Sequence, residues 1–225
     1  MAILGAIFDC DGTLVDSMPM WKKSATWPFD HLGVQSPAGF YERVEPLTVR
    51  EMCRIVHEEH GLFNSADDVY DQLLAHVRDC YRTQVAPFDG VYAFLDSLRD
   101  AGIPMVCASS TPVREVRCAL EAQGLEGYFQ DVISTEEVGR DKEFPDVYLE
   151  ACRRLGLDEK DPQVRGQVWV FEDAPFGVQT SHNAGFKVVG LMNDHDGRRE
   201  EDVAPYCDIY AHGYAELSLE RLRRL

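Results

Sequence analysis

The 225-residue chain has no apolar run approaching the roughly 18 residues that a membrane-spanning helix needs. It is also poor in basic residues: 22 Lys and Arg stand against 39 Asp and Glu, giving a formal net charge of −17. So acidic a chain repels polyphosphate backbones, and no concentrated basic patch interrupts it. We therefore expect no membrane and no nucleic acid as a partner. An anionic small molecule would have to be held locally, by a metal or by a few placed cations.

The chain lacks the paired cysteine spacing of zinc and redox sites, because its seven cysteines are scattered and odd in number. We expect them to be free thiols in a reducing compartment. The first residues are apolar, but they lack the basic leader and the small-residue cleavage site of a signal peptide. These absences favour a cytoplasmic protein, which we expect to be a monomer or a weak homodimer.

What the sequence does contain is an alternation of strand and helix patterns. Apolar runs typical of buried parallel strands lie at 3–8, 103–108, 131–134, 168–171 and 187–191, with a weaker one at 208–211. Helical patterns lie between them at 91–101, 112–123, 145–155 and 175–184. The alternation predicts an α/β fold with a doubly wound, Rossmann-like, mostly parallel sheet that helices cover on both faces.

One segment breaks this alternation. Residues 17–86 contain no convincing strand, whereas 48–60 and 66–81 have the apolar spacing of amphipathic helices. We interpret the segment as an all-α cap domain inserted after the first strand. The α/β catalytic core then comprises residues 1–16 and 87–225.

Charged and hydroxyl side chains gather where the expected strands end. They are Asp9 and Asp11, Ser109 and Ser110, Lys142, and Glu172 and Asp173. Ligands of an open parallel sheet bind beyond the carboxyl ends of its strands, so we expect these side chains to converge. Several carboxylates together with one lysine and a hydroxyl are the inventory of a magnesium-assisted phosphoryl-transfer site.

The pattern resembles the haloacid dehalogenase superfamily of phosphatases. Residues 8–17, Phe-Asp-Cys-Asp-Gly-Thr-Leu-Val-Asp-Ser, are similar to its first motif, Asp-x-Asp-Gly-Thr-Leu. Ser109 resembles the second motif, Lys142 the third, and Glu172 with Asp173 the acidic fourth. The four motifs follow in order, and the helical insert is similar to the cap of the beta-phosphoglucomutase and phosphoglycolate phosphatase branch.

The resemblance implies a Mg²⁺-dependent phosphatase that hydrolyses a small phosphomonoester, such as a sugar phosphate. Asp9 is implied as the nucleophile that forms an aspartyl-phosphate, and Asp11 as the general acid and base. The phosphoryl oxygens would be bound by Ser109, Ser110 and Lys142. The metal would be bound by the carboxylates of Asp9, Glu172 and Asp173 and by the backbone carbonyl of Asp11.

Other functions remain open at this point. A phosphosugar mutase of the beta-phosphoglucomutase type shares the aspartyl-phosphate chemistry. In the mutases a histidine follows the first motif, and Trp21 at the corresponding position favours water as the acceptor. A dehalogenase is disfavoured because those members lack the second aspartate. A non-catalytic binding protein on the same fold would be expected to have lost Asp9 or Asp11.

The third motif departs from the family pattern. The family usually has Gly-Lys-Pro there, whereas Lys142 lies between Asp141 and Glu143. We expect these flanking carboxylates to pair with Lys142 and to weaken its hold on phosphate.

Several expectations concern the cap. Its hinges should lie near residues 15–19 and 86–90. Its interior should include Trp21, Trp27, Phe29 and Leu32. At least one of its basic residues should face the core and hold a polar leaving group, and the candidates are Lys22, Lys23, Arg43, Arg50 and Arg54.

The histidines are weaker candidates for function. His57 and His60 are spaced by three residues, not by the four of a zinc-protease helix, so we expect them to be solvated or to lie at the cap interface. His195 is expected in a surface turn.

Overall fold

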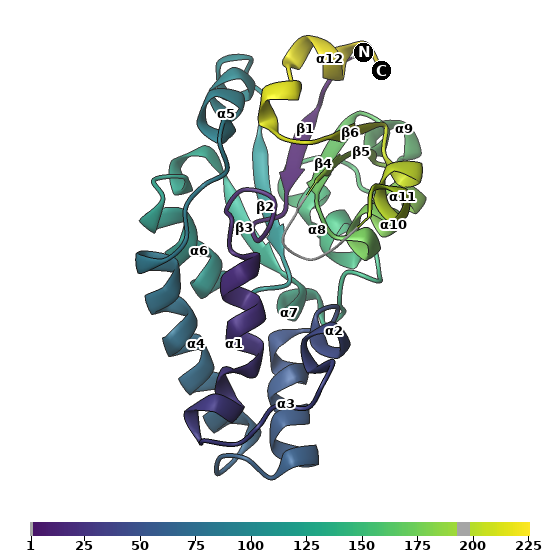
Figure 1. Ribbon diagram of the computed structural model, residues 1–225. Helices are drawn as coiled ribbons and strands as arrows, with labels where there is room; N and C mark the ends of the chain where they lie inside the picture. Colours follow the sequence, from purple (N-terminus) through teal and green to yellow (C-terminus); the bar gives the residue numbers. More distant parts are fainter. Residues whose placement is uncertain (1, 193–198) are drawn as a thin grey trace.

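The computed structural model describes residues 2–192 and 199–225. Six parallel strands form one sheet in the order β3-β2-β1-β4-β5-β6 (Figure 1). The strands are β1 Gly5–Phe8, β2 Met105–Ser109, β3 Asp131–Ser134, β4 Val168–Glu172, β5 Lys187–Leu191 and β6 Ile209–Ala211. The predicted doubly wound sheet is confirmed, with strand ends shifted by only one or two residues.

Strand β1 lies inside the sheet because all four of its residues are apolar or small and buried. It pairs with β2 on one side, with Phe8 opposite Cys107, and with β4 on the other, with Phe8 opposite Phe171. The strand order reverses at β1, and such a switch point leaves a crevice at the carboxyl ends of the strands. The residues that follow β1, β2 and β4 therefore meet there.

Helices cover both faces of the sheet, as the alternation predicts. Side chains from α5 (Val91–Asp100) and α6 (Val113–Ala122) pack with Phe8 on one face. Side chains from α8 (Asp146–Arg154) pack with Ile7 on the other face, and α10 (Pro175–Asn183) also packs against the sheet. The shorter helices are α7 Thr135–Val138, α9 Pro162–Arg165, α11 Glu200–Val203 and α12 Leu219–Arg223, with 3-10 turns at Glu126–Tyr128, Ala204–Tyr206 and Tyr214–Glu216.

Residues 17–86 form four helices at the opposite end of the molecule from the chain termini (Figure 1). They are α1 Met18–His31, α2 Phe40–Val44, α3 Val49–His60 and α4 Ala66–Thr83, and no residue of 17–86 lies in a strand. The sequence predicted α3 and α4 but not α1. Pro28 lies inside α1 and cannot donate a helical hydrogen bond, so a sequence pattern does not favour a helix there.

Local signals explain where α3 and α4 begin. Thr48 and Glu51 form a capping box at the start of α3, and Ser65 accepts a hydrogen bond from the amide of Asp68 at the start of α4. The two helices then pack against each other through their buried apolar faces. These contacts give the insert an interior that is continuous with the larger core cluster of the sheet.

One expectation about the interior of the insert was wrong. Leu32 is 46% exposed. It comes directly after the last residue of α1, so it does not continue the side of that helix that packs into the interior. Trp21 is half-buried and packs against the core cluster as expected, and it also lines a cavity toward the sheet. Phe29 is buried as expected, and Trp27 packs against the core cluster from its edge.

The two segments that connect the insert to the sheet lie against each other. The amide of Asp16 donates to the carbonyl of Ala86 at 2.8 Å, and the amide of Phe88 donates to the carbonyl of Leu14 at 3.1 Å. The division into a core of residues 1–16 and 87–225 and a cap of residues 17–86, with hinges at these segments, stays a prediction.

All seven cysteines are free thiols, as predicted. Within the described ranges, no helix combines the length and the apolar character needed to cross a bilayer. His57 contacts the carbonyl of Leu62, and His60 packs edge-on against Phe29, so both lie within the insert. His195 lies outside the described residues.

Candidate active site

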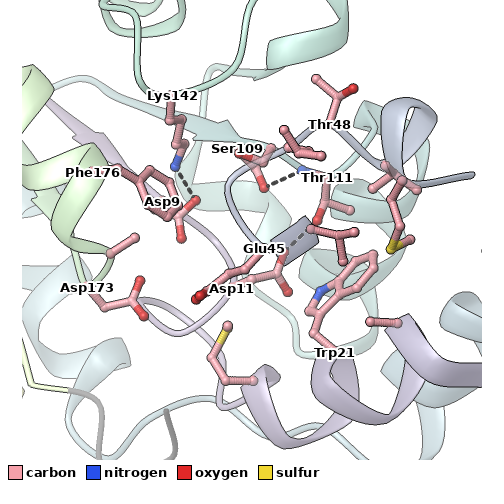
Figure 2. Close-up of a pocket in the computed structure, with 18 of the residues that line it drawn as sticks. Asp9, Asp11, Trp21, Glu45, Thr48, Ser109, Thr111, Lys142, Asp173 and Phe176 are labelled. Carbon is pink, nitrogen blue, oxygen red and sulfur yellow. Dashed lines mark hydrogen bonds and ion pairs between the residues drawn. The ribbon is translucent and has the colours of Figure 1, made fainter. Parts of the chain in front are cut away.

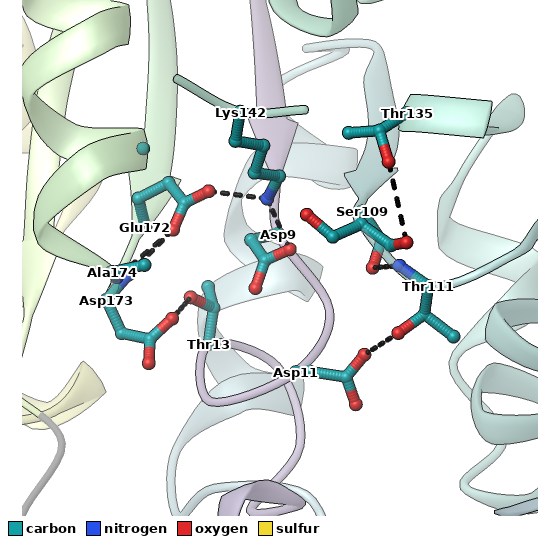
Figure 3. Close-up of polar contacts among 12 residues, drawn as sticks. Asp9, Asp11, Thr13, Ser109, Thr111, Thr135, Lys142, Glu172, Asp173 and Ala174 are labelled. Atoms are coloured by element: carbon teal, nitrogen blue, oxygen red, sulfur yellow. Dashed lines mark hydrogen bonds and ion pairs between the residues drawn. The ribbon is translucent and has the colours of Figure 1, made fainter. Parts of the chain in front are cut away.

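The predicted site residues meet at the carboxyl edge of the sheet (Figure 3). Asp9 directly follows β1, and Gly12 allows the chain to turn sharply after Asp11 because its φ of +86° lies in the left-handed region. Ser109 ends β2, and Glu172 ends β4. The convergence follows from strand order alone, since these strands are neighbours in the sheet.

Lys142 forms the centre of a buried network. Its Nζ donates to Oδ1 of Asp9 at 2.6 Å and to Oε1 of Glu172 at 2.5 Å (Figure 3). The expected pairing with the flanking carboxylates is wrong: Asp141 instead accepts a hydrogen bond from the amide of Glu143. Neighbours in the sequence were the wrong guide to the partners of Lys142, because its side chain is buried while Glu143 is exposed.

Glu172 is fixed by four hydrogen bonds. Oε1 also accepts from the hydroxyl of Tyr148 at 2.7 Å, and Oε2 accepts from the amides of Asp173 at 3.1 Å and Ala174 at 3.2 Å. Helix α10 approaches this carboxylate closely at Gly177. A Cβ there would lie 2.6 Å from both Oε1 of Glu172 and the Tyr148 hydroxyl, so only glycine fits. The sequence showed neither Tyr148 nor Gly177 as part of the site.

The charges in this network perturb one another strongly. Burial raises the pKa of Asp9, the ammonium of Lys142 opposes that shift, and the carboxylates of Glu172 and Asp173 add to it. Burial alone would lower the pKa of Lys142, but Asp9 and Glu172 more than offset this effect and raise it. Lys142 therefore stays charged, and a further cation would relieve the excess negative charge around Asp9.

Three buried carboxylates could hold that cation. One oxygen each from Asp9, Glu172 and Asp173 lies within 4.8 Å of the others. Asp173 accepts a hydrogen bond from the hydroxyl of Thr13 at 3.2 Å, which orients it toward the cluster (Figure 3). Carboxylate oxygens are the donors that hard divalent cations prefer, so the donor set fits such an ion.

The Asp11 carboxylate points away from this cluster and receives three hydroxyl hydrogen bonds. Oδ1 accepts from Ser17 at 2.6 Å and from Tyr81 at 2.7 Å, and Oδ2 accepts from Thr111 at 2.8 Å. The indole of Trp21 in turn donates to the Tyr81 oxygen at 3.0 Å. Burial and the neighbouring Asp11 raise the pKa of Tyr81, so its hydroxyl remains a donor. The insert thus contacts Asp11 directly.

The serines predicted to bind phosphate lie on the facing side of the site. Ser109 is buried, and its Oγ accepts a hydrogen bond from the amide of Thr111 at 3.0 Å. The carbonyl of Ser110 accepts a longer hydrogen bond from Thr135, at 3.5 Å. Both serines line the same cavity as Asp9 and Lys142.

The cavity lies between the sheet edge and the insert (Figure 2). It opens to solvent, and about 100 Å³ of it can hold the centre of a water-sized molecule. The insert contributes a mostly apolar wall. Its residues with polar groups are Trp21, Tyr41, Glu45 and Thr48, and its apolar residues are Met18, Ala25, Val44, Leu47, Val49 and Met52.

The expectation that a basic residue of the insert faces this site was wrong. Among the described residues that line the cavity, Lys142 of the core is the sole cation. Sequence analysis also missed four residues whose hydroxyls hold the carboxylates: Thr13, Ser17, Tyr81 and Thr111. Thr13 and Ser17 lie inside the first motif and could have been found there, whereas Tyr81 carries no local signal because it is 70 residues from Asp11.

Comparison with known proteins identifies the family. The model of the haloacid dehalogenase-like hydrolase family matches residues 6–191. The chain belongs to this family. This chain is 29% identical to hexitol phosphatase A of Escherichia coli (strain K12) over 227 residues. The alignment covers 98% of this chain and 96% of that protein.

A second relative agrees with the predicted branch, and a solved structure agrees with the fold. The chain is 27% identical over 224 residues to the phosphoglycolate phosphatase of Rhodobacter capsulatus, covering 96% of this chain and 88% of that protein. The crystal structure of beta-phosphoglucomutase from Clostridium difficile superposes with a TM-score of 0.76 at 16% identity, covering 99% and 96% of the two chains. The resemblance read from the four motifs is therefore confirmed.

Proposed function

We propose that the protein is a Mg²⁺-dependent phosphatase that hydrolyses a small phosphomonoester through an aspartyl-phosphate on Asp9. The observation that carries the proposal is the position of the Asp9 carboxylate. It is buried in the cavity, with one oxygen bound to Lys142 and two further carboxylates within reach of a shared cation.

Asp9 is suited to act as the nucleophile. Lys142 engages Oδ1, and no described residue donates a hydrogen bond to Oδ2, which is left to attack phosphorus. Lys142 holds Asp9 in orientation and offsets negative charge that develops on the phosphoryl oxygens. We assign Ser109 and Ser110 to those oxygens, because both serines line the cavity beside Asp9.

We assign the cation to Asp9, Asp173 and the backbone carbonyl of Asp11. Glu172 contributes its charge at the edge of the same cluster, since its two oxygens already accept four hydrogen bonds. When bound, Mg²⁺ would offset the repulsion between a carboxylate nucleophile and a phosphate dianion.

Asp11 is suited to act as the general acid and base. Its carboxylate faces the insert side of the cavity, away from the Asp9 cluster (Figures 2 and 3). From there it can donate a proton to the leaving alcohol and then take one from the hydrolytic water. The three hydroxyls that bind Asp11 fix its orientation for both steps.

The deciding experiment is phosphate release from p-nitrophenyl phosphate with and without Mg²⁺. We expect activity with Mg²⁺, none in EDTA, and poor replacement by Ca²⁺, whose larger and looser coordination shell disturbs the in-line geometry. Full activity in the chelator would contradict the proposal.

The mutase alternative has its own test. Trp21 can only donate a hydrogen bond, and it does so to Tyr81, so it does not supply a titrating switch beside Asp11. We therefore propose water as the acceptor. The test supplies beta-glucose 1-phosphate with a trace of the 1,6-bisphosphate. Rapid formation of glucose 6-phosphate with little inorganic phosphate would favour the mutase.

A further inference from the structure

Two aromatic side chains of the insert form a chain of hydrogen bonds that ends on Asp11. The indole Nε1 of Trp21 in α1 donates to the Tyr81 oxygen at 3.0 Å, and the Tyr81 hydroxyl in α4 donates to Oδ1 of Asp11 at 2.7 Å. The two rings meet edge to face, with their centroids 6.5 Å apart. Trp21 lines the cavity beside Asp11 (Figure 2), whereas Tyr81 is fully buried and does not line it.

The direction of this chain follows from the chemistry of its groups. An indole N–H can only donate, so the Tyr81 oxygen is the acceptor of the first bond. A tyrosine hydroxyl carries a single hydrogen, and the indole has no lone pair that could receive it. The hydrogen of Tyr81 is therefore directed to the carboxylate of Asp11.

The backbone of Tyr81 is held from the side of the sheet. The side-chain amide of Gln123, which directly follows α6, donates to the carbonyl of Tyr81 at 3.2 Å. Near Tyr81 on α4, Arg78 forms a largely buried ion pair with Glu115 of α6. These contacts fix the backbone of Tyr81, so the position of its hydroxyl depends on the ring and on the bond from Trp21.

Building on the proposed function, we propose that Trp21 is a positioning residue of the hydrolysis and that it acts on Asp11 through Tyr81. Its indole N–H keeps the Tyr81 hydroxyl directed at Oδ1, and Asp11 thereby keeps one orientation toward the leaving oxygen. Hydrogen bonds in such a chain also polarise one another, which strengthens the bond from Tyr81 to Asp11. Trp21 thus links the insert wall of the cavity to the residue that we assign to acid and base catalysis.

The first experiment measures kcat/KM with Mg²⁺ for phenyl phosphate and for p-nitrophenyl phosphate. Both release a phenol, but the unsubstituted one is the poorer leaving group and needs more acid catalysis. Trp21→Phe keeps an aromatic ring in the cavity wall and removes the N–H. It should lower kcat/KM about three- to tenfold for phenyl phosphate and less than about twofold for p-nitrophenyl phosphate, since Ser17 and Thr111 still bind Asp11. Equal losses on both substrates would overturn the inference.

A double-mutant cycle shows whether Trp21 acts through Tyr81. The hydroxyl is absent in Tyr81→Phe, so adding Trp21→Phe should lower kcat/KM for phenyl phosphate by less than about a further twofold. Losses that multiply would mean that the two residues act independently, which would overturn the inference. Trp27→Phe is the matched control. Trp27 lies on the same helix but does not line the cavity, so the ratio of kcat/KM for the two substrates should keep its wild-type value.

A measurement without substrate separates this inference from the proposed function. The indole N–H resonance of Trp21, assigned by its loss in Trp21→Phe, should shift upfield and exchange faster with solvent in Tyr81→Phe, because its acceptor is lost. The indole resonances of Trp27 and Trp169 should stay in place. An unchanged Trp21 resonance would overturn the inference even for an active phosphatase. A wild-type protein that fails to hydrolyse p-nitrophenyl phosphate with Mg²⁺ would instead contradict the proposed function, whatever the resonance shows.

Discussion

The two walls of the cavity are built in opposite ways. The wall from the sheet edge carries Asp9, Lys142, Glu172 and Asp173, all buried and joined by ion pairs and backbone hydrogen bonds. The wall from residues 17–86 is mostly apolar, and among the described lining residues it carries no cation. Asp11 lies between the two walls. It follows β1 at the sheet edge, and its carboxylate accepts a hydrogen bond from Tyr81 of α4.

The difference indicates that the sheet-edge wall carries out the reaction and that the insert wall selects the substrate. Several hydrogen bonds fix each buried charged group in one orientation. Such groups cannot adapt to different substrates, but they are preorganised for one reaction. An apolar wall with a single carboxylate supplies little chemistry, yet it can accept or reject a leaving group. Substitutions on the two walls should therefore differ in size and in kind.

The largest effect is expected for Asp9→Asn on the sheet wall. The amide cannot attack phosphorus, so turnover of p-nitrophenyl phosphate should fall by at least about 10³-fold. The variant should remain folded because asparagine preserves the shape of the side chain. Retention of more than a few per cent of activity would show that Asp9 is not the nucleophile.

A large effect on stability is expected for Lys142→Met. Removing the ammonium leaves Asp9 and Glu172 as buried carboxylates without their partner, which costs about 3–5 kcal/mol in the free energy of unfolding. Urea titration at pH 7 measures this loss. Lys160→Met, at an exposed lysine, should change the same quantity by less than about 0.5 kcal/mol. Similar small changes for both variants would mean that the Lys142 ammonium does not stabilise the folded protein.

A smaller effect is expected where the walls meet. Tyr81→Phe removes a hydroxyl from Asp11 and should lower kcat by roughly 10- to 100-fold on alkyl phosphates, because a hydrogen bond to a charged group contributes about 1.5–3 kcal/mol. The loss should be smaller on p-nitrophenyl phosphate, whose leaving group needs less acid catalysis.

Tyr70→Phe provides the matched control for Tyr81→Phe. Tyr70 is on the same helix, and its hydroxyl also donates to a core carboxylate, Glu136, at 2.9 Å, but it does not line the cavity. Equal losses of kcat in both variants, with the same dependence on the leaving group, would show that Tyr81 has only a structural role.

The smallest effect concerns the insert alone. Burial lowers the pKa of His76, whose ring stacks on Trp27 at 5.0 Å between centroids. The unfolded chain therefore binds more protons than the folded chain as the pH falls below the unperturbed histidine pKa, and stability should decrease in that direction. Thermal unfolding from pH 7.5 to pH 5.5 should show a weaker pH dependence in His76→Gln. An unchanged dependence would exclude His76 as a contributor.

The strands and the motif residues were predictable because their signals are local. A continuous apolar run that ends in Asp9 predicts a buried strand and places its functional residue at a sheet edge. Helix α3 was predictable for the same reason, since Thr48, Glu51 and its apolar spacing all lie within the helix or next to it. Helix α1 was not, because Pro28 contradicts the helix that tertiary packing stabilises.

The sequence by itself determined the order of strands and helices, the helical nature of residues 17–86, and the set of carboxylates at the strand ends. Only the tertiary structure decided the partners of those groups: Lys142 with Asp9 and Glu172 instead of its neighbours, Tyr81 with Asp11, and Glu45 as the acidic member of the insert wall. The physical reason is separation along the chain. Backbone preferences act over a few residues, whereas these contacts join groups that come together only when the sheet and the insert have packed.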